Sequence, residues 1–212
     1  MEITVVSHSL ASAFLTRLRD KNTDVQRFRE TVESLSTILF LESSKSLDTE
    51  AIEVETPFEK TIGTEIANDI ILVPIIRAGL GMVEPILKLY PQAVVMHIGA
   101  KRNEETLETI PYYSSLKEDI NGSIVFLLDP MLATGGTLSF AINEIAKFSP
   151  NRINILTVIC APEGIERVSE TADNFNNIPI GLWTVIIDRQ LNEDGYILPG
   201  LGDAGDRIFG TI

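Results

Sequence analysis

Hydrophobic residues follow two different patterns along the chain. Over residues 10–19 and 24–41 they fall at helical spacing, which predicts two helices, the second with Thr23 or Asp24 as its N-cap. From Asp69 onward, short apolar runs alternate with helical patterns, and such runs are typical of parallel strands buried on both faces. We expect these strands over residues 70–73, 93–98, 124–128, 153–160 and 183–187. Alternating strands and helices predict an α/β fold with a doubly wound parallel sheet.

The segments outside these strands are expected to complete a single domain of 212 residues. Residues 1–60 form a helical and arm region, because an alternating segment around Pro57 is typical of an edge strand. Residues 69–188 form the α/β core, in which the polar connection 99–120 is expected to be a lid, a binding loop or a protruding hairpin. Residues 189–212 form a glycine-rich C-terminal loop. Its Gly-x-Gly-x-x-Gly string is no dinucleotide motif, because too few residues follow it.

Charge and composition narrow the functional classes. The formal net charge is −13, which argues against nucleic-acid binding, since that needs basic patches. No apolar run approaches the ~20 residues that span a membrane, and no secretory signal is visible at the N-terminus. With a single cysteine, Cys160, the composition predicts a cytoplasmic protein that binds neither membrane nor nucleic acid. A phosphate site on so acidic a chain must collect its arginines and lysines locally.

One segment, residues 124–137, has the order of a phosphate-binding turn. A buried apolar strand ends at Asp129 and Pro130, and the string Thr-Gly-Gly-Thr then opens a helical pattern. The free N–H groups of a helix N-terminus bind anions, and glycines let the backbone approach a ligand closely. Asp129 would repel phosphate, so it needs ribose hydroxyls or a magnesium ion as its partner. The segment therefore predicts a site for a sugar phosphate.

Short glycine motifs have two other interpretations. A nucleotide-hydrolase P-loop needs a lysine after its second glycine, and the sequence has no lysine between Asp129 and Asn143. An ordinary strand-to-helix turn is the alternative that a glycine pair alone favours. Arg77, Arg102 and Asp129, however, all follow the ends of expected strands, where ligands bind in doubly wound sheets. This convergence favours the binding site.

Five parts of the chain resemble the uracil phosphoribosyltransferase family of type I phosphoribosyltransferases. They occur in that family's order and spacing: Val73–Met82, Arg102–Thr106, Asp129–Thr137, Ala161–Ile165, and Gly195–Ile197 with Pro199–Asp206. The resemblance implies a phosphoribosyltransferase-type sheet with a hood. It implies a pyrimidine-salvage reaction in which uracil and 5-phosphoribosyl 1-diphosphate (PRPP) give UMP and diphosphate with Mg²⁺. It further implies a homodimer or homotetramer, with GTP as an allosteric activator of some members.

The resemblance also implies a role for each matching residue. The residues expected to bind PRPP are Arg77, Arg102, Asp129, Pro130, Met131, Leu132, Ala133, Thr134, Gly135, Gly136, Thr137 and Asp203. Among them, Asp129 holds the ribose hydroxyls, the glycine turn cradles the 5-phosphate, and the two arginines bind the diphosphate. The residues expected to read uracil, largely through backbone groups, are Ile197, Gly202, Asp203 and Ala204.

Catalysis is assigned by the same resemblance to Asp203, Arg77 and Arg102, with Asp203 assisting the loss of a proton from uracil. No protein residue is assigned to the metal, because magnesium binds together with the diphosphate. The resemblance also implies a cis peptide bond between Arg77 and Ala78. Two positions depart from the family's usual residues: Lys101 stands where tyrosine is common, and Thr137 replaces a commoner serine.

Two rival functions remain. One is a regulator on the same fold that binds nucleotides or RNA without useful turnover, although the net charge of −13 disfavours an RNA-binding face. The other is a related enzyme that takes a purine or orotate. Orotate calls for an extra cation beside the base, and the tail from Tyr196 to Ala204 contains none.

Overall fold

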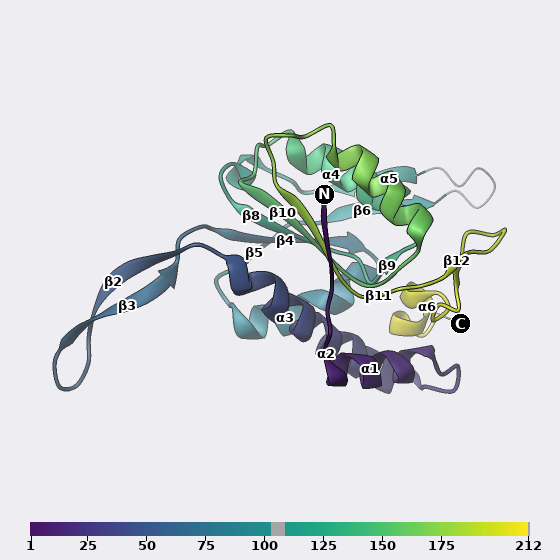
Figure 1. The fold of residues 1–212 in the computed structure, drawn as a ribbon, viewed down its shortest axis with the longest axis horizontal. Helices are drawn as coiled ribbons and strands as arrows, with labels where there is room; N and C mark the ends of the chain where they lie inside the picture. The colour runs from purple at the N-terminus through teal and green to yellow at the C-terminus, as the bar shows by residue number, and fades with distance from the viewer. Residues whose placement is uncertain (103–108, 212) are drawn as a thin grey trace.

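A mainly parallel sheet runs through the middle of the molecule, with helices on both faces (Figure 1). The computed structural model describes residues 1–102 and 109–211, and their side chains apart from those of Lys101 and Arg102. In chain order, the strands of this sheet are β1 (Glu2–Val5), β4 (Ile70–Ile76), β5 (Val94–Val95), β6 (Ile98–Arg102), β7 (Thr109–Ser114), β8 (Ile124–Leu128), β9 (Met131–Leu132), β10 (Arg152–Cys160) and β11 (Ile180–Ile187).

The order of the strands in space is β1-β11-β10-β8-β4-β6-β7, with β5 beside β4 and β9 beside β10. Neighbouring strands are parallel, except that β6 and β7 form an antiparallel hairpin. The central pairing aligns Val73 with Leu127 and Leu127 with Ile155. The predicted α/β fold with a parallel sheet is therefore confirmed, and residues 99–102 and 109–114 of the polar connection 99–120 belong to this hairpin.

Helices cover the two faces of the sheet. On one face lie α1 (Ser9–Arg19), α2 (Val25–Ser43) and α3 (Val83–Leu89), and on the other α4 (Gly136–Ala146) and α5 (Pro162–Ala172) (Figure 1). Side chains of the central strands alternate between the two resulting cores, because successive residues of a strand point to opposite faces. In β8, Phe126 packs into the core beneath α2, whereas Val125 and Leu127 pack into the core beneath α4. No described helix is both long and apolar enough to cross a membrane.

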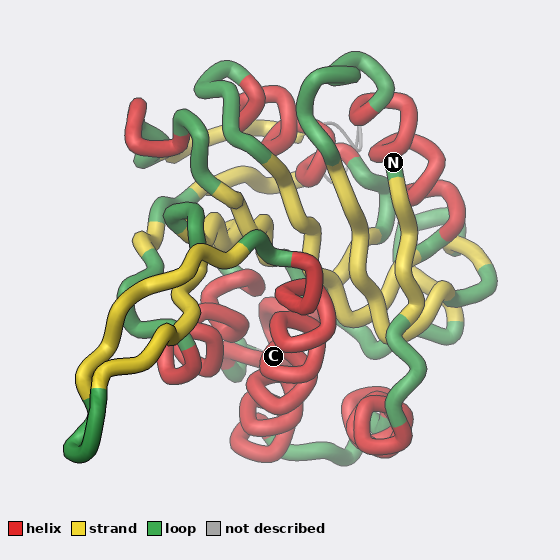
Figure 2. Tube along the Cα trace, turned by 60° about the vertical axis from the view of Figure 1, so that its left-hand side comes forward, coloured by secondary structure: helices red, strands yellow, loops and turns green. Residues whose placement is uncertain are grey.

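The expected arm is a two-stranded antiparallel hairpin of β2 (Thr49–Glu55) and β3 (Lys60–Ile66). It projects away from the rest of the molecule (Figure 2). Pro57 lies in the turn of this hairpin rather than within a strand, as its missing N–H group requires. Phe58, next to it, is 95% exposed.

Several boundaries differ from the sequence-based expectation. The edge strand β1 was not expected, because four half-exposed residues contain no continuous apolar run. The strand expected over 93–98 is divided into β5 and β6, which pair with successive parts of β4. The C-terminal segment, expected to be a loop, contains the hairpin β12 (Gln190–Leu191)–β13 (Ile197–Leu198) and the helix α6 (Ala204–Phe209). The shortness of these elements leaves no periodic pattern to detect.

Candidate active site

The glycine turn leads from the carboxyl end of β8 into α4, as the sequence predicts. After Leu128 the chain passes through Asp129 and the two residues of β9, and α4 begins at Gly136. Gly135 is the N-cap residue, with a left-handed φ of 76° that favours glycine, and no side chain caps the helix. An uncapped helix N-terminus directs free N–H groups and the positive dipole end toward the turn. The local geometry thus suits an anion.

The first turn of α5 supports the glycine turn from below. A Cβ atom added to Gly164 would lie 2.2 Å from the carbonyl oxygen of Ala133, and one added to Gly135 would lie 2.7 Å from the carbonyl oxygen of Gly164. Neither contact leaves room for a side chain, so the two backbone segments touch directly. This support was not predicted, although Gly164 lies within one of the family-like strings.

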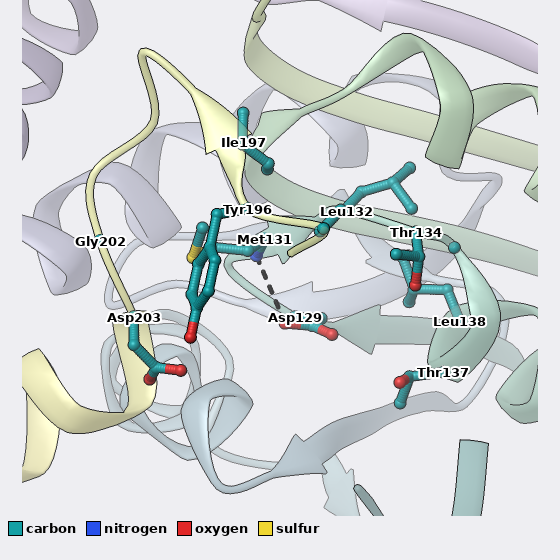
Figure 3. Close-up of a pocket in the computed structure, with 13 residues that line it drawn as sticks. Asp129, Met131, Leu132, Thr134, Thr137, Leu138, Tyr196, Ile197, Gly202 and Asp203 are labelled. Carbon is teal, nitrogen blue, oxygen red and sulfur yellow. Dashed lines mark hydrogen bonds between the residues drawn. The ribbon is translucent and has the colours of Figure 1, made fainter. Parts of the chain in front are cut away.

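The C-terminal segment closes the other side of a pocket above this turn (Figure 3). The pocket has a volume of about 200 Å³. Its lining residues are Asp129, Met131, Leu132, Ala133, Thr134, Gly135, Thr137, Leu138, Gly195, Tyr196, Ile197, Gly202 and Asp203. Figure 3 shows the glycine turn on one side, Gly202 and Asp203 on the other, and Asp129 between them in this view. Segments about 60 residues apart in sequence therefore form one site.

A second hollow of about 490 Å³ adjoins the first and shares Met131 and Asp203 with it. Arg77, Tyr112 and Ala204 are among its other lining residues. A ligand that reached from the glycine turn past Asp203 would enter this hollow and meet Arg77. The two hollows together offer an extended site with an anion-binding turn at one end and an arginine at the other.

Two carboxylates face the first pocket. Burial raises the pKa of Asp129 to about 7, the negative charge of Asp203 acts in the same direction, and the Met131 N–H, which donates to Asp129 Oδ1 at 3.3 Å, opposes them. Asp203 Oδ1 accepts a hydrogen bond from the N–H of Asp206 at 2.9 Å and so caps α6. Asp129 is therefore poised to exchange its proton for a cation or for hydroxyl donors near neutral pH.

Arg77 follows β4 and contacts the C-terminal segment. Its Nη2 atom lies 3.1 Å from Asp206 Oδ1. A hydrogen bond from Thr211 and the contact with Arg77 hold the pKa of the Asp206 carboxyl below its usual range. A cis peptide bond joins Ile76 and Arg77, so the bond expected between Arg77 and Ala78 was placed one residue too late. β4 itself ends at Ile76, and the chain turns there.

Most of the expected site residues come together, and a few lie elsewhere. Pro130 and Gly136 do not line the pocket: Pro130 is buried beneath the turn, where its carbonyl accepts hydrogen bonds from β10, and Gly136 forms the start of α4. Ala204 lines the adjoining hollow instead. The backbone of Arg102 ends β6, but its side chain, like residues 103–106 of the family-like string, lies outside the described part of the chain.

Some pocket residues had no role in the sequence-based interpretation. Tyr196 lines the pocket, and although it belongs to the family-like segment Gly195–Ile197, it was assigned no function there. Arg167 of α5 lies along the glycine turn, since a Cβ atom added to Gly136 would be 3.2 Å from its Nη1 atom. No periodicity or motif marks Arg167, because its proximity arises only when α5 packs beside α4. Among the described residues, no cluster of three or more His, Cys, Asp or Glu side chains could hold a metal ion.

Comparisons with known proteins point to one family. A family model described as uracil phosphoribosyltransferase matches residues 5–211. The uracil phosphoribosyltransferase of Mycoplasma genitalium is 44% identical over 209 residues, which cover 99% of both chains. That of Paenarthrobacter aurescens is 44% identical over 212 residues, covering all of this chain and 99% of the relative. The solved structure of AQ2163 protein from Aquifex aeolicus superposes with a TM-score of 0.91 at 41% identity, covering 98% of this chain and 97% of the other.

Proposed function

The chain belongs to the uracil phosphoribosyltransferase family of pentosyltransferases, and we propose that it converts uracil and PRPP to UMP and diphosphate in pyrimidine salvage. One observation carries this proposal. The glycine turn at the N-terminus of α4 and the C-terminal segment, which come from distant parts of the sequence, line the same pocket. Such a pocket can hold a sugar phosphate and a base at bonding distance, which converts a bimolecular reaction into an effectively unimolecular one.

The sugar phosphate occupies the side of the pocket formed by the glycine turn. The 5-phosphate lies at the N-terminus of α4, where the helix dipole and the hydroxyls of Thr134 and Thr137 stabilise its charge. The ribose hydroxyls donate to the carboxylate of Asp129. The raised pKa of Asp129 supports this role, since hydroxyl donors restore the hydrogen bonds that burial removes from the charged form.

The diphosphate extends into the adjoining hollow toward Arg77, with Arg102 as its second cation. Arg77 exchanges its ion pair with Asp206 for the diphosphate oxygens, and the new partner carries more charge. The carboxylates of Asp129 and Asp203 suit a magnesium ion, which typically takes one or two carboxylates together with substrate phosphate oxygens. When bound, magnesium supplies positive charge that stabilises the departing diphosphate.

Uracil lies against the C-terminal segment, at Ile197 and Gly202–Ala204. A backbone that presents both N–H and C=O groups can pair with the carbonyl–NH–carbonyl edge of uracil, and the amino group of cytosine would remain unpaired there. Gly202 has a φ of 82° and so exposes its peptide groups without a side chain in the way. Asp203 assists the loss of the proton from uracil as the bond to ribose forms.

We also propose an oligomeric state, an activator and a location for the protein. Assembly into a homodimer or homotetramer follows from the family resemblance, and the projecting arm, where Phe58 is 95% and Ile62 69% exposed, offers apolar side chains for such a contact. Activation by GTP is proposed from the family resemblance. The cytoplasmic location and the single-domain organisation are proposed from the composition. Analytical ultracentrifugation tests the assembly, and turnover measured with and without GTP tests the activation.

Release of diphosphate from PRPP and Mg²⁺, measured in parallel with uracil, cytosine, orotate and hypoxanthine, tests the proposed reaction. We expect release with uracil alone. Release with hypoxanthine or orotate instead would identify one of the rival enzymes. Tight binding of PRPP without release for any base would favour the regulator, whose absence of turnover is its defining property.

A further inference from the structure

A partly buried ion pair, with the Arg19 side chain 22% exposed, anchors the part of the C-terminal segment that is proposed to read uracil. Arg19, at the end of α1, and Asp188, which follows β11, form a two-pronged contact, with Nη2–Oδ1 at 2.6 Å and Nη1–Oδ2 at 3.1 Å. The Asp188 side chain is only 2% exposed. Neither residue lines either of the two hollows. The pair therefore has no direct access to a substrate.

The same pair holds both backbone groups of Gly200. The N–H of Gly200 donates to Asp188 Oδ2 at 3.0 Å, and its carbonyl oxygen accepts from Arg19 Nη1 at 3.3 Å. Gly200 lies in the turn 199–203, here called the base-reading turn, two residues before the pocket-lining Gly202. One ion pair thus fixes the orientation of the peptide groups on both sides of Gly200, near the start of this turn.

A second arginine fastens the middle of the base-reading turn to the same helix. Arg207 of α6 donates to the carbonyl oxygens of Leu201 at 2.8 Å and Asp20 at 2.7 Å, and also to that of Leu18. Its guanidinium lies over the ring of Phe28 in α2, 4.2 Å from the centroid. The base-reading turn is therefore held against the end of α1 at two adjacent residues, Gly200 and Leu201.

The turn needs such anchors because of its composition. Gly200 and Gly202 both have positive φ, at 63° and 82°, and glycine loses more conformational freedom on ordering than any other residue. A turn that reads a base through its backbone binds well only if its peptide groups are already oriented, since ordering them on binding would reduce the affinity. A buried carboxylate paired with an arginine is a rigid means of orienting them, because the charged hydrogen bonds are short and directional.

We infer that Arg19 and Asp188 are positioning residues that set the affinity of the site for uracil by holding Gly200. This inference rests on the proposed function and assigns a role to the N-terminal helix α1, which contributes no residue to either hollow. The effect should fall mainly on the base: of the residues assigned to PRPP only Asp203 lies in the base-reading turn, and the hydrogen bonds that tie this ion pair to the backbone go to Gly200 and not to the glycine turn that takes the 5-phosphate.

Steady-state kinetics of Arg19→Gln and Asp188→Asn test the inference. We expect the KM for uracil to rise at least tenfold while the KM for PRPP stays within twofold of the wild-type value. Arg17→Gln is the matched control, because Arg17 lies in the same last turn of α1, is exposed and changes the net charge equally. A role in stability alone would lower the melting temperature and the active fraction, but KM does not depend on the active fraction.

A double variant keeps the test valid if the single variants fail to fold. Arg19→Met with Asp188→Leu removes both charges and both Gly200 contacts without leaving a buried charge unpaired, and such replacements are often tolerated. We expect it to fold and still to show the raised KM for uracil. An unchanged KM for uracil in this variant and in Arg19→Gln, with an active wild type, would overturn this inference alone. A wild type that releases no diphosphate with uracil would overturn the proposed function, and this inference with it.

Discussion

Replacement of Gly164 by alanine tests whether the glycine turn depends on its support by α5. The new Cβ atom would lie 2.2 Å from the carbonyl oxygen of Ala133, 3.0 Å from its carbonyl carbon and 2.9 Å from Leu132 Cδ1. The first two are backbone atoms, which cannot move aside as the end of a flexible side chain could. The substitution must therefore displace either the start of α5 or the turn that is proposed to bind the 5-phosphate.

The size of the displacement follows from these distances. Real Cβ atoms essentially never lie within 3.0 Å of another heavy atom, and ordinary contact begins at 3.4 Å, so a distance of 2.2 Å requires the two backbones to separate by roughly 1 Å. A misplacement of about 1 Å in a binding or catalytic group costs on the order of 10²-fold in activity. The effect on folding is smaller, because overpacking costs about 1–3 kcal/mol and alanine recovers up to ~1 kcal/mol over glycine in a helix. The variant should thus remain folded but lose function.

Calorimetric titration with ribose 5-phosphate measures this loss directly, because the ligand occupies the glycine turn without requiring turnover. We expect binding to weaken by about 10²-fold, because the displaced turn would lose one or two hydrogen bonds to the charged phosphate, each worth about 1.5–3 kcal/mol. Gly63→Ala in the arm is the control, since its Cβ atom would meet only the side chains of Val54 and Ile52, at 3.4 Å or more. Binding of ribose 5-phosphate to Gly164→Ala within threefold of the wild type, with an unchanged melting temperature, would show that close backbone contact does not position the turn.

Three further predictions concern charged groups around the pocket. In the wild type, PRPP–Mg²⁺ affinity should rise about tenfold from pH 6 to pH 8, because Asp129, with its raised pKa of about 7, must lose its proton to bind hydroxyls or the cation. In Asp129→Asn, only the pH dependence that comes from titration of the PRPP phosphates should remain. If the affinity of this variant varied with pH as that of the wild type does, the assignment would be refuted. Arg167→Gln should weaken ribose 5-phosphate binding by up to about fivefold at low salt, as for a surface ion pair, whereas Lys147→Gln, at the far end of α4, should not; equal effects would mean that net charge alone matters. Asp203→Asn should lower kcat on the order of 10²-fold and leave the melting temperature nearly unchanged, because asparagine caps α6 as well as aspartate; a rate close to the wild-type value would exclude Asp203 from proton transfer.

The sequence alone was sufficient to predict the elements that carry a long periodic pattern. The helices α1 and α2, the strand β8, and the turn from Asp129 into α4 each lie within at most 19 consecutive residues. Apolar periodicity indicates both the local conformation and the buried face of a segment. A glycine pair ahead of a helical pattern indicates a helix N-terminus without a side-chain cap. The anion site and the acid beside it were therefore predictable as one unit.

Only the tertiary structure decided what surrounds that unit. Gly164 touches Ala133, Arg167 lies against Gly136, and Arg19 reaches Asp188 across 169 positions of sequence. No local pattern encodes such contacts, because they depend on which helix packs beside which strand end. The strand β1 and the helix α6 were missed for the related reason that short elements gain their stability from the neighbours they pack on. The sequence determined the chemistry of the turn, and the packing of distant segments determined how rigidly that chemistry is held.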